Sequence, residues 1–176
     1  MKNDPGRLPE PGIQVCESLV RVRFHEVDAL GHVNNAAYLN YLEQAAIDHA
    51  ALLGLDLERL RSLGGVFVAR RHEVIFRLPA HAGDVLRIVT WLEAPRGARV
   101  ERRYAVFRDA GQARDVPLGG RLTDAEAIDR DGDWIVQAAT EWVFASERGQ
   151  PRRIPSEVVA AFRLGDWPGG GEGGTR

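Results

Sequence analysis

Apolar and polar side chains alternate over much of the chain, and this two-residue period predicts β-strands. The first predicted strand spans residues 17–24. Four further strands are predicted over residues 66–78, 86–92, 100–106 and 134–144. Because short turns containing proline or glycine join these long strands, we expect them to pair antiparallel.

Residues 35–53 instead carry apolar side chains every three to four positions, as a helix does. Two rows of apolar side chains run along this segment. One row consists of Leu39, Leu42, Ala46, Ala50 and Leu53, and the other of Tyr38, Tyr41, Ala45 and Leu52. A helix with two apolar rows is expected to be buried on several sides. Asn34 is suited to cap its first turn, and Gly54 is suited to end its last turn.

The remaining segments carry weaker patterns. Residues 155–164 predict a short terminal helix, whereas residues 110–130 fit a long excursion of a hairpin with room for one short strand. Residues 1–12 and 165–176 are rich in proline or glycine and are expected to be disordered tails. The body between them, residues 13–164, is predicted to be a single domain.

The order of these elements predicts the fold class. A strand, a long helix and then four or more antiparallel strands indicate an α+β fold in which a curved sheet wraps around the helix. Such a sheet has open edges, and pairing with a second copy of the chain would cover them.

Composition argues against several classes of protein. The 176 residues carry a formal net charge of -2, without the basic excess of a nucleic-acid binder. No apolar run is long enough to cross a bilayer and the first residues are not a secretory signal, so we expect a cytoplasmic location. Cys16 is the only cysteine, which excludes a disulfide framework or a cysteine metal cage within one chain. Neither Gly-x-Ser-x-Gly nor a strand-linked Gly-x-Gly-x-x-Gly occurs, so an α/β-hydrolase elbow and a dinucleotide fold lack support.

The candidate chemistry lies in the polar segment from Phe24 to Tyr38, which leads into the predicted buried helix. Buried polar groups need partners, so a polar cluster at this position requires an explanation. One explanation is helix capping alone. Asn34 would then be the cap, Asp28 would complement the helix dipole, and Gly31 would form the turn.

A catalytic explanation uses the same groups. The first N–H groups of a helix have no partner within the helix and carry partial positive charge, so they can bind a developing oxyanion. A carboxylate on Asp28 or Glu26 can attack a carbonyl carbon directly or activate water. Together these groups would form an acyl-transfer site. The residues alone leave both explanations open.

A metal site is a third explanation, and the sequence disfavours it. His25, Glu26, Asp28 and His32 are suitable ligand types, but their order does not match the His-Glu-x-x-His zinc motif. They also do not share one face of a helix. We therefore expect no metal and no other cofactor.

The segment from Val22 to Glu43 resembles the signature of the 4-hydroxybenzoyl-CoA thioesterase family of hotdog-fold acyl-CoA thioesterases. The residues that carry the resemblance are Phe24, Asp28, Gly31-His32-Val33-Asn34-Asn35, Tyr38 and Tyr41-Leu42-Glu43. Two later pieces also match, namely Gly83-Asp84 and Arg152-Arg153-Ile154-Pro155. The resemblance covers residues 18–164 apart from the 110–130 excursion.

The resemblance implies a hotdog fold that assembles as homodimers or homotetramers, with metal-free active sites at the subunit interface. It implies that Asp28 is the catalytic carboxylate and that the backbone N–H of Asn35 polarises the thioester carbonyl. Gly31, His32 and Asn34 are expected to support this site.

The implied substrate is a small-molecule acyl-CoA. Tyr38 and Leu42 are expected to line the acyl pocket, and Arg70, Arg71 and Arg77 are candidates to contact the CoA phosphates. Plant-type acyl-carrier-protein thioesterases share the core motif but have an asparagine two residues after the aspartate. This chain has Leu30 there, which argues against their full catalytic set. The identity of the acyl group and of the carrier stays open.

The implied function is hydrolysis of an acyl-CoA thioester to a free acid and CoA, with Asp28 as nucleophile or general base. One alternative is hydration or dehydration of an acyl thioester, for which Asp28 and His32 would form a proton-handling pair. Another is acyl-CoA binding without catalysis. Release of free thiol distinguishes hydrolysis from both.

Overall fold

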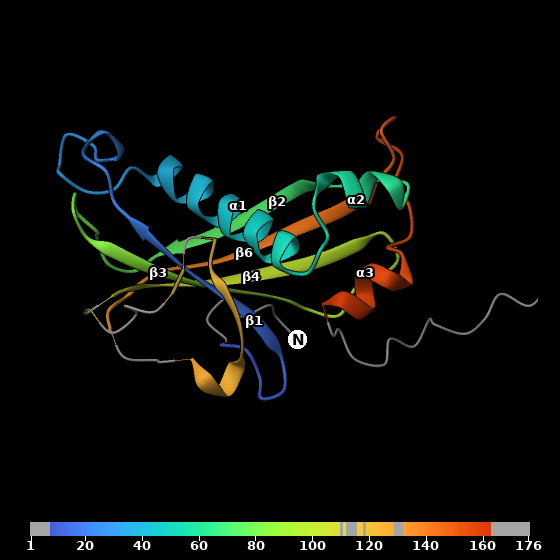
Figure 1. The fold of residues 1–176 in the computed structure, drawn as a ribbon. Coiled ribbons are helices and arrows are strands. Elements are labelled where there is room, and N and C mark those ends of the chain that lie inside the picture. The colour runs from blue at the N-terminus through green and yellow to red at the C-terminus, as the bar shows by residue number, and fades with distance from the viewer. Residues whose placement is uncertain (1–7, 110, 112–115, 118, 129–131, 163–176) are drawn as a thin grey trace, which may run out of the picture.

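One long helix lies across a curved, six-stranded antiparallel sheet in the computed structural model of the chain (Figure 1). The structure describes residues 8–109, 111, 116–117, 119–128 and 132–162. The strands are β1 (Gln14–Arg21), β2 (Val66–Phe76), β3 (Val85–Leu92), β4 (Arg99–Arg108), β5 (Arg121–Asp124) and β6 (Trp134–Ala145). The helices are α1 (Asn35–Leu52), α2 (Leu57–Ser62) and α3 (Ser156–Ala161), with two 3-10 turns, η1 (Phe24–Glu26) and η2 (Ala125–Ala127). The strand order is β2-β6-β4-β3-β1-β5, and the predicted α+β hotdog architecture is confirmed.

The two ends of α1 are fixed by the residues that the sequence indicated. The Asn34 side chain accepts a hydrogen bond from the backbone N–H of Ala36 at 2.9 Å, as an N-cap does. At the other end, Gly54 has a φ of 72°, a left-handed conformation that glycine adopts without strain. The predicted helix is therefore confirmed, and it ends one residue earlier than expected.

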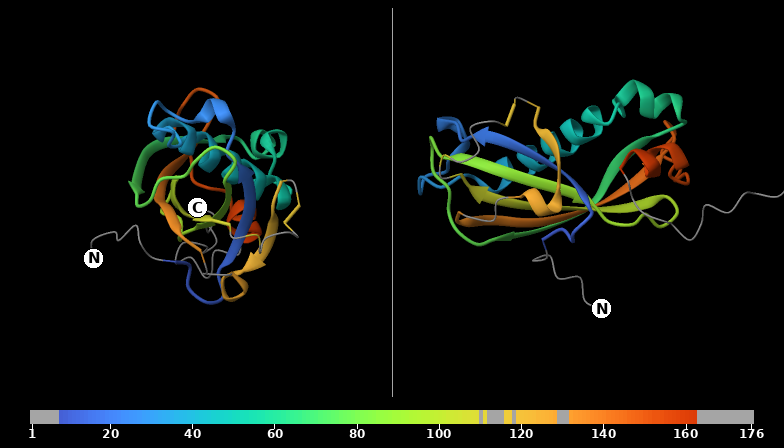
Figure 2. Two further views of the ribbon diagram at one scale, coloured as in Figure 1. Left: turned by 90° about the vertical axis from the view of Figure 1, so that its left-hand side faces the viewer. Right: turned by 60° about the horizontal axis from the view of Figure 1, so that its bottom comes forward.

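The inner face of α1 packs against the concave face of the sheet, which curls around it (Figure 2). Tyr38, Leu42 and Ala45 lie in this interface and are 3%, 1% and 1% exposed. Leu86 and Ile88 of β3 belong to the same cluster. Full burial of one such leucine contributes about 1.5–3 kcal/mol, so this interface fixes where the first turn of α1 lies.

The opposite face of the sheet is also covered. Val89 and Trp91 of β3 pack with Phe107 of β4, and Ala125 and Ile128 cover them. Because β3 and β4 are covered on both faces, they are buried almost continuously. The described part of the 110–130 excursion thus supplies the short strand β5, which pairs with β1, and the covering turn η2.

The strand predicted over residues 17–24 lies closer to the N-terminus than expected. β1 ends at Arg21, and Phe24–Glu26 forms η1 instead. The Glu26 carboxylate accepts a hydrogen bond from the backbone N–H of Arg23 at 2.6 Å and closes this turn, as in a capping box. The alternation of apolar residues carries no information about such a bond.

Burial of α1 on several sides was a wrong expectation for the single chain. Leu39, Ile47 and Leu52 are 36%, 54% and 43% exposed, so one long side of α1 is open. The short helix α2 was not predicted either. Its first turn is capped by the Asp56 carboxylate, which accepts a hydrogen bond from the N–H of Arg59 at 2.8 Å.

The sheet has β2 and β5 as its two edge strands. β2 spans 11 residues, and its apolar side chains Val68, Ile75 and Phe76 are 51%, 39% and 44% exposed. A long, exposed and partly apolar edge of this kind is a surface that pairs readily with another strand. In the part of the chain that the structure describes, no helix is long and apolar enough to span a membrane.

Candidate active site

The loop from Arg23 to Asn34 connects β1 to α1 and is held in one shape by its own backbone. Val27 and Val33 form an isolated antiparallel bridge. Inside that bridge, the N–H of Asp28 donates to the carbonyl of His32 at 2.8 Å, and the N–H of Gly31 donates to the carbonyl of Asp28 at 3.0 Å. Gly31 has a φ of 77°, which explains why glycine is needed at the tip.

The Asp28 carboxylate lies at the surface of this loop and uses only one of its two oxygens internally. Oδ1 accepts hydrogen bonds from the backbone N–H groups of Leu30 at 2.8 Å and His32 at 3.2 Å. Among the described residues, no donor lies within hydrogen-bond distance of Oδ2. The side chain is thus oriented by the loop while one oxygen stays available to a ligand.

The start of α1 leaves one amide group open. The N–H of Ala36 is taken by the side chain of Asn34, and the N–H of Ala37 donates to the carbonyl of Asn34 at 2.9 Å. No acceptor for the N–H of Asn35 is found in the described part of the chain. This amide therefore combines the positive end of the helix dipole with a free donor.

The turn between β2 and β3 supports the loop from the other side. The N–H of Val33 donates to the carbonyl of Ala80 at 2.8 Å. The rings of His32 and His81 meet edge to face, with centroids 5.3 Å apart. Asp84 accepts from the N–H of His81 at 2.9 Å and is paired with Arg108. The predicted Gly83-Asp84 turn therefore lies beside the candidate site.

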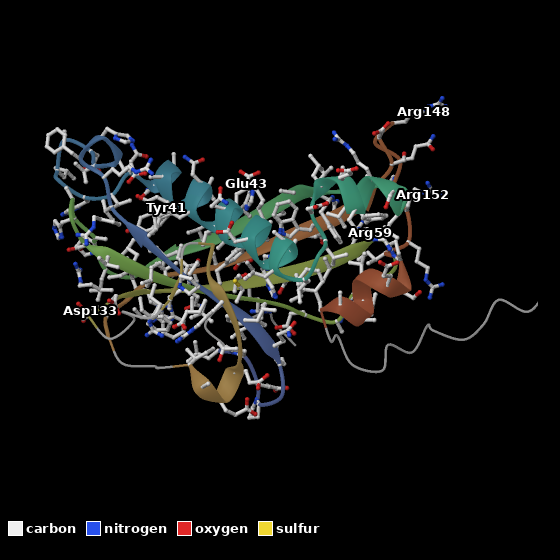
Figure 3. All side chains as sticks on the ribbon, in the orientation of Figure 1. Tyr41, Glu43, Arg59, Asp133, Arg148 and Arg152 are labelled. Atoms are coloured by element: carbon white, nitrogen blue, oxygen red, sulfur yellow. The ribbon has the colours of Figure 1, made fainter. Side chains whose placement is uncertain are left out.

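A partly buried hydrogen bond ties the loop to α1. The Tyr41 hydroxyl donates to Glu26 Oε2 at 2.6 Å, and Figure 3 shows Tyr41 on the side of α1 that faces the sheet. Burial raises the pKa of the Glu26 carboxyl, but the bonds from Tyr41 and from the Arg23 N–H outweigh it and leave the pKa below its usual range. Burial and the bond to Glu26 both raise the pKa of Tyr41, so its hydroxyl keeps its proton.

The site residues predicted from the sequence lie in three places: the loop and helix start, the interface between α1 and the sheet, and strand β2 with the residue after it. Asp28, Gly31, His32, Asn34 and Asn35 meet in one loop and the helix start. Tyr38 and Leu42 are buried between α1 and the sheet, and their role as pocket residues stays a prediction.

The arginines predicted to bind phosphate lie on or just after β2. Arg70 pairs with Glu141, and Arg71 lies 4.0 Å from Glu73. The Nε of Arg77 donates to Oε1 of Gln137 at 3.0 Å. The guanidinium of Arg77 also lies over the ring of Trp134. Their role as phosphate contacts also stays a prediction.

A cavity of about 370 Å³ lies between the second half of α1, α2 and the sheet. Its lining is mostly apolar and includes Ile47, Ala50, Phe67 and Trp142. Among the described residues, its one lining arginine is Arg102 of β4. The sequence carried a signal for this residue, because Arg102 interrupts an otherwise apolar alternation that includes Val100, Tyr104 and Val106.

Residues 22–162 match the profile of the Thioesterase-like superfamily. A chloroplastic acyl-acyl carrier protein thioesterase from Arabidopsis thaliana is 22% identical over 143 residues, which are 81% of this chain and 65% of that protein. A 1,4-dihydroxy-2-naphthoyl-CoA hydrolase from Thermosynechococcus vestitus is 30% identical over 91 residues, 51% of this chain and 62% of that protein. The chain thus spans less than two thirds of the length of these two relatives.

Solved structures show the same fold. A 1,4-dihydroxy-2-naphthoyl-CoA thioesterase from Synechocystis has a TM-score of 0.68 at 16% identity, covering 88% of this chain and 99% of that chain. A 4-hydroxybenzoyl-CoA thioesterase variant complexed with 4-hydroxybenzoyl-CoA has a TM-score of 0.67 at 21% identity, covering 84% of this chain and 97% of that chain. The matches support the hotdog fold.

Tyr41→Phe tests the tie between the loop and α1. A hydrogen bond to a charged group contributes about 1.5–3 kcal/mol, so the variant is expected to unfold at lower denaturant concentration at pH 7. Because the pKa of Glu26 is lowered in the folded state, this contribution is fully present above its usual pKa of 4.5 and is lost as the pH falls through the folded pKa. Denaturant titrations from pH 7 to acid should therefore show the difference narrowing. A difference that is absent, or constant with pH, would refute the role of Glu26. Tyr38→Phe removes a hydrogen bond to the Ala80 backbone instead of one to a carboxylate, so it is the control whose effect should not follow the titration of Glu26.

Proposed function

The chain belongs to the thioesterase-like superfamily, and from this we propose that it hydrolyses an acyl thioester to a free acid and a thiol. The observation that carries the proposal is that the Asp28 carboxylate, with one oxygen available, and the open N–H of Asn35 belong to the same loop and helix start. These are the two groups that acyl transfer needs, a base or nucleophile and an oxyanion donor.

The thioester carbonyl oxygen accepts from the N–H of Asn35, and the helix dipole favours the negative charge that builds on it. Asp28 either attacks the carbonyl carbon, giving a mixed anhydride that water then hydrolyses, or removes a proton from the attacking water. In both routes the C–S bond breaks and a proton reaches the departing thiolate. The water oxygen ends on the acyl carbon in the general-base route, and in the anhydride route when water attacks the acyl carbonyl. Gly31, His32 and Asn34 act by holding the loop and capping the helix.

CoA is the proposed thiol carrier, in keeping with the CoA thioesters named for several relatives. Its phosphates would meet arginine side chains, for which Arg70, Arg71 and Arg77 are the candidates. Arg70 and Arg71 lie on the exposed edge strand β2, where a second chain would add a surface. Arg77 is already oriented by its bond to Gln137.

The proposed active form is a homodimer or homotetramer with shared sites. Pairing of two β2 strands around a two-fold axis would continue the sheet, cover the exposed apolar side chains of β2 and run the two α1 helices antiparallel. The first turn of one α1 would then lie beside the second half of the other. The open side of α1, with Leu39 and Ile47, would also be covered.

Hydration or dehydration of a thioester has less support. That chemistry needs a second proton-handling group beside Asp28, and His32 was the candidate. His32 contacts Asp28 through its backbone N–H, while its ring packs against His81. Hydrolysis remains the function that this geometry supports best.

Asp28→Asn keeps the size of the side chain and removes its charge. We expect kcat for acyl-CoA hydrolysis, measured by thiol release, to fall by at least ~10²-fold, since a positioned base contributes about 10²–10⁴-fold. Asp124→Asn, an exposed carboxylate at the end of β5, is the control and should keep full activity. If Asp28→Asn turned over acyl-CoA as fast as the wild type, Asp28 would have no catalytic role.

Asn35→Pro deletes the proposed oxyanion donor with little change to the helix. Proline is well tolerated at the first helical position, and Asn34, with φ of -58° and ψ of 136°, lies near the polyproline II region and outside the helical region that proline disfavours in the preceding residue. We expect kcat to fall by about 10²–10³-fold while thermal stability is kept. Asn35→Ala retains the N–H and should be much milder. The reverse order would instead indicate a role for the Asn35 side chain.

Light scattering tests the shared-site assembly. We expect a mass of two or four 19.5 kDa chains, and we expect Val68→Lys on the edge of β2 to produce a monomer with little activity. A fully active wild-type monomer would contradict the proposed assembly.

A further inference from the structure

Arg102 brings a charged group to the apolar cavity between α1, α2 and the sheet. The side chain rises from β4 toward α1, and the residue is only 4% exposed. It lines the cavity together with apolar residues such as Leu92, Val100 and Phe162. A guanidinium carries its charge at any physiological pH, so burial here requires a favourable partner.

The partners that the structure provides for Arg102 are neutral. Nη1 donates to Nδ1 of His49 at 3.0 Å and to the hydroxyl of Thr90 at 3.2 Å. The guanidinium also lies 5.6 Å from the centroid of the Phe162 ring. Among the described residues, no carboxylate lies within 4.0 Å of it.

The titratable groups around Arg102 do not supply a negative charge either. Burial, and then the positive charge of Arg102, lower the pKa of His49 to about 2, so the ring is neutral. Burial raises the pKa of Cys16 to about 12 and also raises that of Tyr104, so both keep their protons. Within the described part of the chain, this buried cation is thus matched by neutral groups, although desolvating such an ion costs several kcal/mol.

Among the described residues, two carboxylates line the cavity, and both belong to exposed residues. The Asp56 side chain is engaged in capping α2, and Glu43 is exposed on α1, where Figure 3 shows it on the outward side of the helix. Solvent and salt screen exposed charges far more than buried ones. An anionic group that reaches the inner end of the cavity therefore experiences mainly the charge of Arg102.

The cavity lies too far along α1 for a short acyl group held at the same chain's Asn35. With a rise of 1.5 Å per residue, the α1 residues that line the cavity lie from about 12 Å (Glu43) to about 24 Å (Ala51) from Asn35 along the helix axis. Two-fold pairing through β2 would bring the cavity of one chain close to Asn35 of the other, because it places the second half of one α1 beside the first turn of the other. The volume of about 370 Å³ falls at the lower end of the range for small-molecule sites.

We infer that this cavity receives the acyl group of a thioester bound at Asp28 of the partner subunit, and that Arg102 selects acyl groups ending in a carboxylate. The inference rests on the proposed thioesterase function and its dimer. The apolar walls would hold the methylene chain, and the unmatched guanidinium would bind the terminal carboxylate as an ion pair. The substrate class is therefore ω-carboxyacyl thioesters of short or medium length.

Paired substrates test this selectivity. We expect the wild type to hydrolyse adipoyl-CoA with a kcat/KM at least ~10-fold above that for hexanoyl-CoA, since a hydrogen bond to a charged group is worth about 10-fold to 150-fold. In Arg102→Met, of similar length but uncharged, this ratio should fall by about 10-fold to 100-fold, mainly through loss of adipoyl-CoA hydrolysis. A wild type that prefers hexanoyl-CoA, or a ratio unchanged in Arg102→Met, would overturn the inference.

Control variants separate selection from folding. Arg102→Lys keeps the charge and should retain part of the preference for adipoyl-CoA. Ala51→Trp adds bulk at the cavity and should lower activity on both substrates, whereas Ala94→Trp, an exposed turn position outside the cavity, should not. If Arg102→Met loses thermal stability and the ratio is unchanged in both Arg102→Met and Arg102→Lys, Arg102 has only a structural role.

Binding of free adipate distinguishes failure of this inference from failure of the proposed function. Calorimetry on the slowly reacting Asp28→Asn protein should detect binding of adipate that is stronger than binding of hexanoate and that Arg102→Met abolishes. If adipate binds in this way but no thioester is cleaved by the wild type, the proposed function fails and the anion site stands. If thioesters are cleaved but neither adipate binding nor the substrate preference depends on Arg102, the anion site fails and the proposed function stands.

Discussion

A helix that is buried along one side must still satisfy the amide groups of its first turn, and α1 leaves one of them open. The Asn34 cap serves the second amide, so the N–H of Asn35 projects its partial charge beside the Asp28 loop. The rest of the fold holds this arrangement in place. The wrapped sheet fixes the inner face of α1, the Val33–Ala80 bond fixes the loop from outside, and Tyr41 fixes it from within.

Much of this could be predicted from sequence because it follows local rules. Two-residue alternation located β2, β3, β4 and β6, and the Asn34 cap and Gly54 stop located α1. The grouping of Asp28, Gly31 and Asn35 followed from their closeness in the chain and from the family resemblance. Features that depend on contacts between distant segments, or on single side-chain bonds, were missed. The η1 turn depends on one carboxylate, and the open side of α1 depends on how far the sheet curls.

Arg102 shows how contacts between distant segments escape prediction from the sequence. Its position in an inward-facing alternation was visible in the sequence. That the described residues around it carry no matching charge emerges only when the fold brings His49, Thr90 and Phe162 to it. A buried ion without a counter-ion is unfavourable for stability alone. Under the proposed function, the same feature would become a means of choosing between acyl groups, and the catalytic end of one chain and the cavity of the other would form one site.

The central claim is that the amide of Asn35 and the carboxylate of Asp28 act on one carbonyl group. The most direct measurement is the infrared carbonyl stretch of a ¹³C-labelled acyl-CoA bound to the slowly reacting Asp28→Asn protein. The account predicts a band at lower frequency than in water, because the helix amide polarises the C=O bond, and a return toward the water value when Asn35→Pro is added. A carbonyl band that matches the value in water, or that is unaffected by Asn35→Pro, would contradict it.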